Sequence, residues 1–125
     1  MNEERINSLY ITKMNDDKPI MIAPKSEKGL AVDLHTQFIN VKSNKIELDI
    51  LINNQNGVKI DEFSKIIGTT KLKSTVNKSF IGEIVTYLIL ENSEIENVNM
   101  LEFNVTINKK ITGTTVLFLK ENSHG

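Results

Sequence analysis

Cysteine is absent from this chain of 125 residues. Without cysteine there is no disulfide framework, no thiolate nucleophile and no cysteine-ligated zinc or iron–sulfur site. Histidine is scarce as well, and neither His35 nor His124 belongs to an HxH or HxxxH pair. Because a metal centre needs several such ligands at close spacing, the sequence predicts neither a metal site nor a cofactor.

Arginine and aromatic residues are also rare. Of the 15 Lys and Arg residues only Arg5 is an arginine, and aromatic residues make up 6% of the chain. Forked recognition of phosphates or guanine edges normally uses arginine, and single-stranded nucleic acid is bound by stacking on aromatic rings. With a net charge of −1 and a pI near 6.1, the chain has no general attraction for polyanions. We therefore predict no nucleic-acid partner and no membrane partner.

Long apolar runs are missing too. No segment approaches the ~18 apolar residues of a membrane span, and the N-terminal sequence MNEERINSLY has no apolar core of the signal-peptide type. We expect a soluble, cytoplasmic protein that folds as a single domain over residues 1–125, with flexible ends at 1–8 and 121–125.

Apolar residues at every second position are the main positive signal. This period of two is typical of half-buried strands. On one face of segment 30–38 it places Leu30, Val32, Leu34, Thr36 and Phe38. On one face of segment 46–52 it places Ile46, Leu48, Ile50 and Ile52. The two segments are expected to pair as a hairpin around Lys42, Ser43 and Asn44, with Asn44 in the left-handed conformation. Phe38 would then lie opposite Leu48.

The segments before and after this pair show further strand signals. Residues 9–14 and 19–24 predict a first hairpin, whose second arm lies at a sheet edge because proline cannot donate to a strand ladder. Asn56-Gly57 predicts a type I′ turn that folds the next residues back on 46–52. Residues 61–67 have the spacing of one or two helical turns.

The C-terminal third continues the pattern. Residues 80–90 are apolar on both faces, which favours a central strand covered on both sides, although the segment can also be drawn as a helix. Residues 101–107 and 111–119 alternate clearly and are joined by a turn at 108–110, with Gly113 marking a bulge or a bend. The chain therefore predicts an all-β or β-rich α+β fold, an antiparallel sandwich or barrel of about seven strands with at most one or two short helices.

Few side chains are suited to binding or catalysis. Asp33 and His35 share the outer face of segment 30–38, where an imidazole next to a carboxylate can act in binding or acid–base chemistry, and where two solvated neighbours are the commoner case. Lysines are frequent in the middle of the chain, and acidic residues are frequent in the stretch that follows. If the fold gathers these lysines on one face, that basic face could steer a partner toward the protein, or it could simply keep the protein soluble. The predicted basic face consists of Lys65, Lys71, Lys73 and Lys78.

These observations favour a non-catalytic protein-interaction module. Catalytic motifs are missing, and the apolar residues on both faces of 80–90 and 111–119 exceed what one small sheet can cover, so a second copy or a target protein is expected to cover the rest. Self-association is the simpler explanation, and we predict a homo-oligomer. Small proteins of this type include inhibitors, immunity proteins and phage or mobile-element accessory proteins. The alternative is a small-molecule carrier, a β-barrel that keeps an interior pocket of roughly 300 Å³ or more. An enzyme is not predicted.

Overall fold

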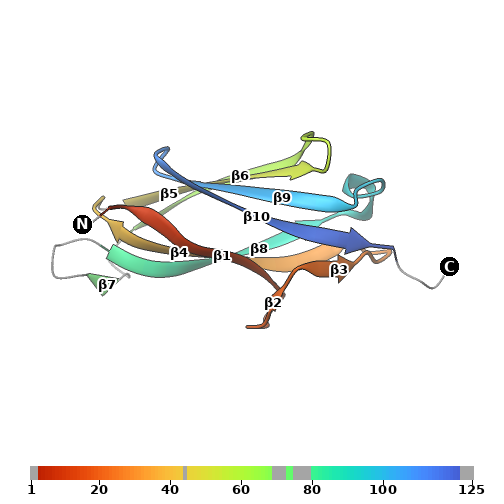
Figure 1. Cartoon of the computed structure of the whole chain (residues 1–125), viewed down its shortest axis with the longest axis horizontal. Helices are drawn as coiled ribbons and strands as arrows, with labels where there is room; N and C mark the ends of the chain where they lie inside the picture. The colour runs from red at the N-terminus through yellow and green to blue at the C-terminus, as the bar shows by residue number, and fades with distance from the viewer. Residues whose placement is uncertain (1–2, 44, 69–72, 75–79, 122–125) are drawn as a thin grey trace.

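The computed structural model describes residues 3–43, 45–68, 73–74 and 80–121. Ten strands and one short 3-10 helix lie in these ranges (Figure 1). The strands are β1 Arg5–Lys13, β2 Pro19–Ile20, β3 Ile22–Pro24, β4 Leu30–Val41, β5 Lys45–Asn54, β6 Lys59–Gly68, β7 Lys73–Ser74, β8 Phe80–Leu90, β9 Met100–Ile107 and β10 Ile111–Lys120, and the 3-10 helix is η2 Asn92–Glu94.

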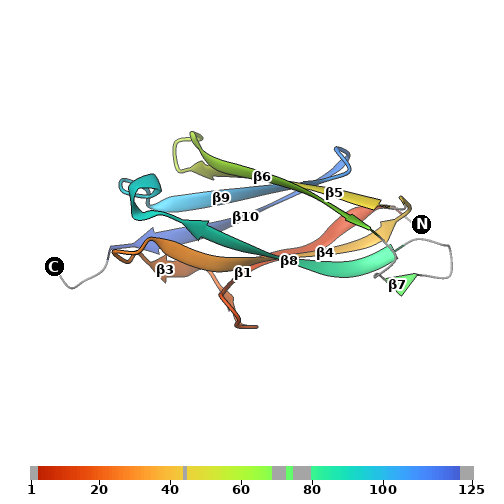
Figure 2. The same cartoon turned by 180° about the vertical axis from the view of Figure 1, so that it is seen from behind.

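The strands form two five-stranded sheets that pack face to face (Figures 1 and 2). Sheet A has the order β2-β1-β4-β8-β7, and sheet B has the order β3-β10-β9-β5-β6. β3 and β10 pair in parallel, and the other strand pairs among the described residues are antiparallel. The predicted antiparallel sandwich is therefore confirmed, with ten strands among the described residues in place of about seven.

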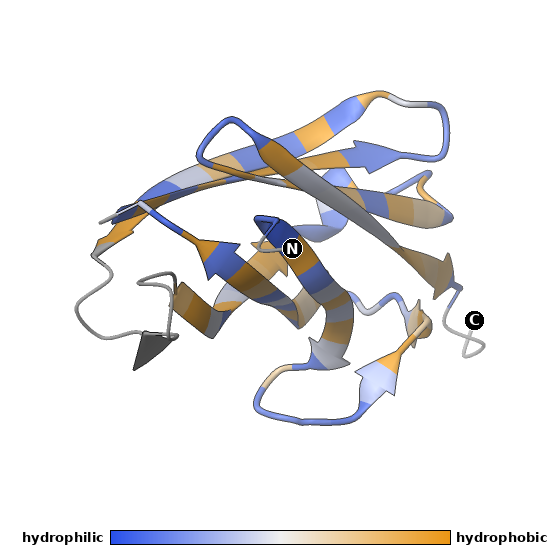
Figure 3. Ribbon diagram, turned by 60° about the vertical axis from the view of Figure 1, so that its left-hand side comes forward, coloured by the Kyte–Doolittle hydropathy of each residue, from blue (hydrophilic) through white to orange (hydrophobic). Residues whose placement is uncertain are grey.

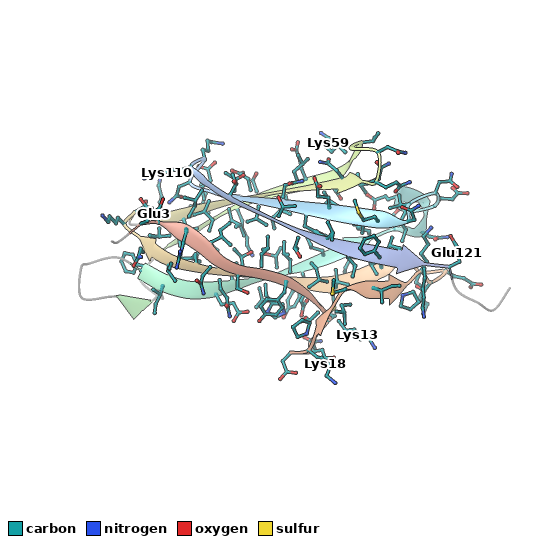
Figure 4. All side chains as sticks on the ribbon, viewed as in Figure 1. Glu3, Lys13, Lys18, Lys59, Lys110 and Glu121 are labelled. Atoms are coloured by element: carbon teal, nitrogen blue, oxygen red, sulfur yellow. The ribbon has the colours of Figure 1, made fainter. Side chains whose placement is uncertain are left out.

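Alternate side chains of the longer strands fill the space between the sheets. Figure 3 shows the corresponding alternation of apolar and polar residues along the ribbons, and Figure 4 shows side chains occupying the interior while Lys13 and Lys18 project away near the β1–β2 turn. The predicted alternation of β9 is confirmed, because its inward residues have no exposed surface; they are Leu101, Phe103, Val105 and Ile107. Burial of such side chains contributes about 1.5–3 kcal/mol each and is the main stabilising term.

The expected hairpin between 30–38 and 46–52 is wrong. β4 pairs with β1 and β8 in sheet A, whereas β5 pairs with β6 and β9 in sheet B. A flat hairpin would leave both apolar faces on one side and still uncovered, whereas placing the two strands in opposite sheets buries both faces in the core between the sheets. The bend lies at Asn40, which has a φ of 60° where the β4–β8 register shifts. Asn44 lies outside the described residues.

The segment 80–90 is a strand, as favoured, but only one of its faces is covered. The inward residues of β8 are buried, including Ile84, Leu88 and Leu90. The other face carries exposed apolar residues, so the expectation of burial on both sides is wrong.

The predicted helical turn at 61–67 is also wrong, because this segment belongs to β6. Residues Lys59–Gly68 pair with β5, except that the register shifts at Ile60, which has no partner on β5. The apolar spacing of Phe63, Ile66 and Ile67 that resembles a helix results from an edge strand whose two faces are both partly exposed. Pairing with the central strand β5 overrides the local pattern.

The type I′ turn that the sequence predicts at Asn56-Gly57 is found instead in the other hairpin of sheet B, between β9 and β10. Gly57 has a φ of 76° and donates from its N–H to Asn54, and Asn54 donates to Val58, which makes a three-residue loop. Asn56 is not in the left-handed region, so the type I′ prediction for Asn56-Gly57 is wrong. The two consecutive left-handed residues of such a turn are Asn108 and Lys109, between β9 and β10.

The N-terminal region connects the two sheets. β1 begins at Arg5, so the expected flexible lead-in is wrong for residues 5–8. β2 pairs with β1 at one edge of sheet A, as predicted, but β3 lies at the edge of sheet B beside β10. Met21 alone separates the two strands, and its carbonyl accepts a hydrogen bond from the Phe118 N–H at 2.9 Å.

Gly113 does not produce the predicted bulge, because β9 and β10 pair without interruption. A Cβ at this position would lie 3.2 Å from the side chain of Ile6, so the glycine allows β1 to pack closely on β10. Within the described ranges, no helix combines the length and apolar character needed to cross a membrane.

Gly29 is predicted to be essential for stability. It has a φ of 94°, and a Cβ would lie 2.0 Å from the carbonyl oxygen of Leu90, where β4 begins beside the end of β8. We expect Gly29→Ala to lower the free energy of unfolding by roughly 2 kcal/mol or more, measured by urea denaturation.

Gly57→Ala is the matched control for this prediction. Gly57 also has a positive φ of 76°, but nothing lies within 4 Å of its added Cβ. This variant should lose only the cost of the left-handed conformation, about 1 kcal/mol. Equal losses for the two variants would contradict the assigned contact between Gly29 and Leu90.

Candidate functional site: the outer face of sheet A

The outer face of sheet A consists of three parallel rows of side chains. The register places Tyr10 of β1 and Val85 of β8 on either side of His35, and Thr12 and Tyr87 on either side of Asp33. The middle row, from β4, is polar, and the row from β8 is mostly apolar. An antiparallel sheet in solution normally has a hydrated outer face, so this arrangement is unusual.

His35 is the centre of a hydrogen-bond network. Its Nδ1 lies 2.7 Å from Oε1 of Glu83, and its Nε2 lies 2.9 Å from Oγ1 of Thr12. Because a carboxylate only accepts, Nδ1 carries the proton of that bond. Tyr10 stacks on the imidazole with ring centroids 4.5 Å apart and donates to the same Glu83 oxygen at 3.0 Å. The network joins β1, β4 and β8.

The prediction that Asp33 and His35 are solvated neighbours is wrong. Asp33 is 3% exposed and His35 is 8% exposed, because the flanking side chains of β1 and β8 cover them. Oδ2 of Asp33 accepts from the N–H of Asn15 at 2.9 Å, which fixes the β1–β2 turn, and Oδ1 has no hydrogen-bond partner among the described residues. The structure brings both residues into one face but leaves little of either for a ligand to contact, so their binding role stays a prediction.

The order hydroxyl, imidazole, carboxylate in Thr12, His35 and Glu83 is the order that activates a nucleophile in serine hydrolases. Such a mechanism requires the hydroxyl to face a substrate. Thr12 is 0% exposed, so no substrate can approach its Oγ1 in this conformation. The arrangement is therefore suited to holding three strands in register.

The environment of the network shifts the pKa values of Glu83 and Tyr10. Partial burial alone would raise the pKa of the Glu83 carboxyl, but hydrogen bonds from His35 and Tyr10 together lower it below the ordinary value of 4.5. Burial, assisted by the hydrogen bond to Glu83, raises the pKa of the Tyr10 hydroxyl. The network therefore favours an ionised Glu83 and a neutral Tyr10.

Next to this network runs an exposed apolar row that we call the outer stripe, made of Ile81, Val85, Tyr87 and Ile89 of β8. Tyr87 is 65% exposed and Ile89 is 64% exposed. The stripe is the feature that the sequence signalled through the apolar character of both faces of 80–90. Apolar side chains gathered on one side of a strand, next to a fixed polar network, form a surface suited to contact with another protein.

A second group of exposed apolar residues lies on the other sheet, where β3 pairs with β10. It contains Met21, Ile22 and Phe118, and Ile22 and Phe118 are register partners. No hydrogen-bonded network comparable to that of His35 involves these side chains among the described residues. This group serves as a comparison surface in the experiments below.

The predicted basic face lies largely outside the described residues. Lys71 and Lys78 are not described, and only the backbone of Lys73 is. Lys65 lies on β6 in sheet B, whereas Lys73 belongs to β7 in sheet A. A shared basic face for the four lysines stays a prediction.

A cleft of about 220 Å³ opens between the sheets on the β6 side. Its walls are mostly apolar, and it is lined by Leu48, Ile50, Phe63, Ser64, Lys65 and Thr86. The volume is smaller than the roughly 300 Å³ expected of a small-molecule carrier. In the part of the chain that the structure describes, no three His, Asp or Glu residues are grouped so that they could hold a metal ion.

Two packed antiparallel sheets define this chain as a β-sandwich. No protein-family model matches the sequence, and no curated protein matches it. Among solved structures, the chain is similar to part of a calcium-binding mutant of Bacteroides uniformis beta-glucuronidase 2, with a TM-score of 0.56 and 13% sequence identity. The match covers 92% of this chain and 14% of that one. A likeness at this identity shows the fold alone.

The network gives a testable pH dependence. Because the folded pKa of Glu83 lies below its ordinary value of 4.5, the unfolded chain takes up the proton first, and acid destabilises the fold. The contribution of Glu83 to the free energy of unfolding is complete above the ordinary pKa of the carboxyl, and it is lost as the pH falls through the lower pKa of Glu83 in the folded protein. We expect Glu83→Gln to reduce the loss of stability on acidification, measured by urea denaturation at a series of pH values.

Glu27→Gln provides the control, since Glu27 is exposed and belongs to none of the ion pairs found between described residues. It should leave the acid dependence unchanged. If Glu83→Gln follows the wild-type curve as closely as Glu27→Gln does, the hydrogen-bond network does not stabilise the ionised carboxylate.

Proposed function

We propose that this protein is a non-catalytic protein-interaction module that contacts a partner protein through the outer stripe. The observation that carries this proposal is the exposure of four apolar side chains along one face of β8, with Tyr87 near their middle. Interface centres are rich in aromatic and aliphatic side chains, and a few of them supply most of the binding energy.

The rigidity of the surface supports the same conclusion. β8 pairs with β4 over most of its length, and Glu83 ties β8 to His35 and Tyr10. A surface that is already ordered loses little conformational entropy when it binds. The partner is expected to present an apolar surface of its own, because burial of the stripe against a polar surface would leave polar groups unpaired.

We propose a non-catalytic role because the hydroxyl in the His35 network is inaccessible. Thr12 has the neighbours of a nucleophile but no exposed surface. Replacing His35 should therefore lower stability without removing a chemical step. A role as an inhibitor, an immunity protein or a phage or mobile-element accessory protein is compatible with such a module, and we propose the cytoplasm as its location.

The carrier hypothesis receives less support. Its best candidate is the inter-sheet cleft of about 220 Å³, which ends at the edge of the sandwich instead of enclosing a ligand. Pockets that bury a small molecule are usually of roughly 300–1,000 Å³. We therefore place the function on the outer face.

The outer stripe can be tested by affinity capture from the native host, followed by titration of each captured protein against purified variants. We expect Tyr87→Ser and Ile89→Ser each to weaken binding about tenfold, since each removes a large apolar contact worth roughly 1–2 kcal/mol. Phe118→Ser, an exposed aromatic residue on the comparison surface, should bind as the wild type does.

Circular dichroism of each variant checks that the sandwich is retained. A captured protein that binds Tyr87→Ser and Ile89→Ser as tightly as wild type contradicts the proposal, and so does one whose binding is lost in Phe118→Ser. Failure to capture any protein that depends on the stripe also contradicts it.

A further inference from the structure

β6 forms one edge of sheet B. It is ten residues long, and within the described ranges no strand pairs with its outer side (Figure 2). A strand of this length presents a row of unpaired backbone groups and is a template for pairing with another chain. The outer stripe belongs to β8 in the other sheet, so this edge is a separate surface.

The backbone groups of β6 that point outward can be identified. The N–H and C=O of Glu47 point toward β9, because Asn108 donates to the Glu47 oxygen and Glu47 donates to Oδ1 of Asn108, both at 2.8 Å. Backbone groups of successive residues in a strand point to opposite sides. Those of Ile50 therefore point toward β6, where its register partner is Phe63.

It follows that Phe63 uses its backbone groups to bond β5, while those of Glu62 and Ser64 point away from the sheet. The N–H of Glu62 indeed has no strand partner and instead donates to Oδ1 of its neighbour Asp61 at 2.8 Å. Among the described residues, the middle of β6 thus has backbone acceptors that no strand pairs with and a donor that only a local side chain satisfies.

The side chains of Asp61, Phe63 and Lys65 lie on the inner side of β6, since their register partners are the buried residues Ile52, Ile50 and Leu48. A charge that points inward at a sheet edge normally opposes pairing. Burial lowers the pKa of Lys65, and neither Lys65 nor Asp61 takes part in an ion pair between described residues. Here the two charges have opposite sign and are four residues apart.

This spacing makes β6 complementary to itself in one register. If two β6 strands run antiparallel about a two-fold axis at Phe63, Asp61 of each copy lies opposite Lys65 of the other, and the two Phe63 rings meet. Glu62 then lies opposite Ser64, so the outward backbone groups bond each other.

Neighbouring registers lack this match. A two-fold axis at Glu62 places the two Glu62 carboxylates opposite each other and Asp61 opposite Phe63. An axis at Ser64 places Phe63 opposite Lys65 and Asp61 opposite Ile67. Shifts by a single residue pair the inner face of one strand with the outer face of the other.

We propose that two copies of this chain form a symmetric dimer by antiparallel pairing of their β6 edges, centred on Phe63 and fixed in register by Asp61 and Lys65. Each Phe63 then also covers the mouth of the inter-sheet cleft that it lines. Two five-stranded B sheets become one continuous sheet of ten strands. The proposal makes no use of the outer stripe.

A charge exchange tests the ion pairs. Sedimentation equilibrium should show that Asp61→Lys and Lys65→Asp each weaken the dimer about tenfold or more, because each places like charges opposite each other. The double variant Asp61→Lys with Lys65→Asp restores opposite charges and should regain the wild-type dissociation constant within about threefold. Tyr87→Ser, which alters only the outer stripe, should dimerise as the wild type does.

A single cysteine tests the register, because the natural chain has none. In the proposed dimer the two Phe63 residues form a non-hydrogen-bonded pair, with Cα atoms about 4.5 Å apart, which a disulfide can bridge. Under mild oxidation Phe63→Cys should give a covalent dimer. Ser64→Cys should give little covalent dimer, because residue 64 lies opposite Glu62 of the other copy and the two cysteines are two residues apart along the paired strands.

These measurements separate the outcomes. A wild-type protein that stays monomeric at its highest soluble concentration overturns the proposal, as do a dimer insensitive to the single charge reversals and preferential cross-linking of Ser64→Cys. If instead Tyr87→Ser dissociates the dimer while the charge reversals do not, the stripe and not β6 joins the copies. Restoration by the double exchange with cross-linking at position 63 supports the proposed pairing.

Discussion

The packing of the inward face of sheet A, which contains β4, against the inward face of sheet B, which contains β5, forms one apolar core, and the remaining structure depends on this constraint. Each face carries large side chains such as Leu34 and Phe38, or Leu48 and Ile52, that have essentially no exposed surface. Because the two strands are consecutive in the chain, their separation into opposite sheets decides which strands are available to pair with each. β1 and β8 complete one sheet around β4, and β6 and β9 complete the other around β5.

The same separation explains the polar network on the outer face. Once β4 lies between β1 and β8, its outward residues are flanked on both sides, and His35 is placed between Tyr10 and Glu83. A network of this kind satisfies buried polar atoms and at the same time favours one register over a slipped one. The polar residues of this face therefore specify the fold, and the apolar residues of β8 remain available at its margin.

The sequence predicts the strand content well, because burial on one face imposes a period of two on β4, β5, β9 and β10. It fails for contacts between strands distant in the chain: nothing in the pattern of 30–38 indicates that Tyr10 stacks on His35 or that Glu83 is hydrogen-bonded to it. Local signals were also misleading at β6, where edge exposure imitates helical spacing. The left-handed Asn40 explains the bend of β4, but an asparagine within an apolar strand does not by itself predict a change of sheet.

The single residue Met21 between β2 and β3 has a consequence for how the sandwich moves. On this side the chain passes directly from the edge of sheet A to the edge of sheet B, so the separation of the two sheets is limited by covalent bonds. On the opposite side, β6 and β8 are held mainly by side-chain packing around a cleft. We therefore expect transient opening to begin at the β6 edge, where amide protons should exchange with solvent sooner than those of β1 and β10.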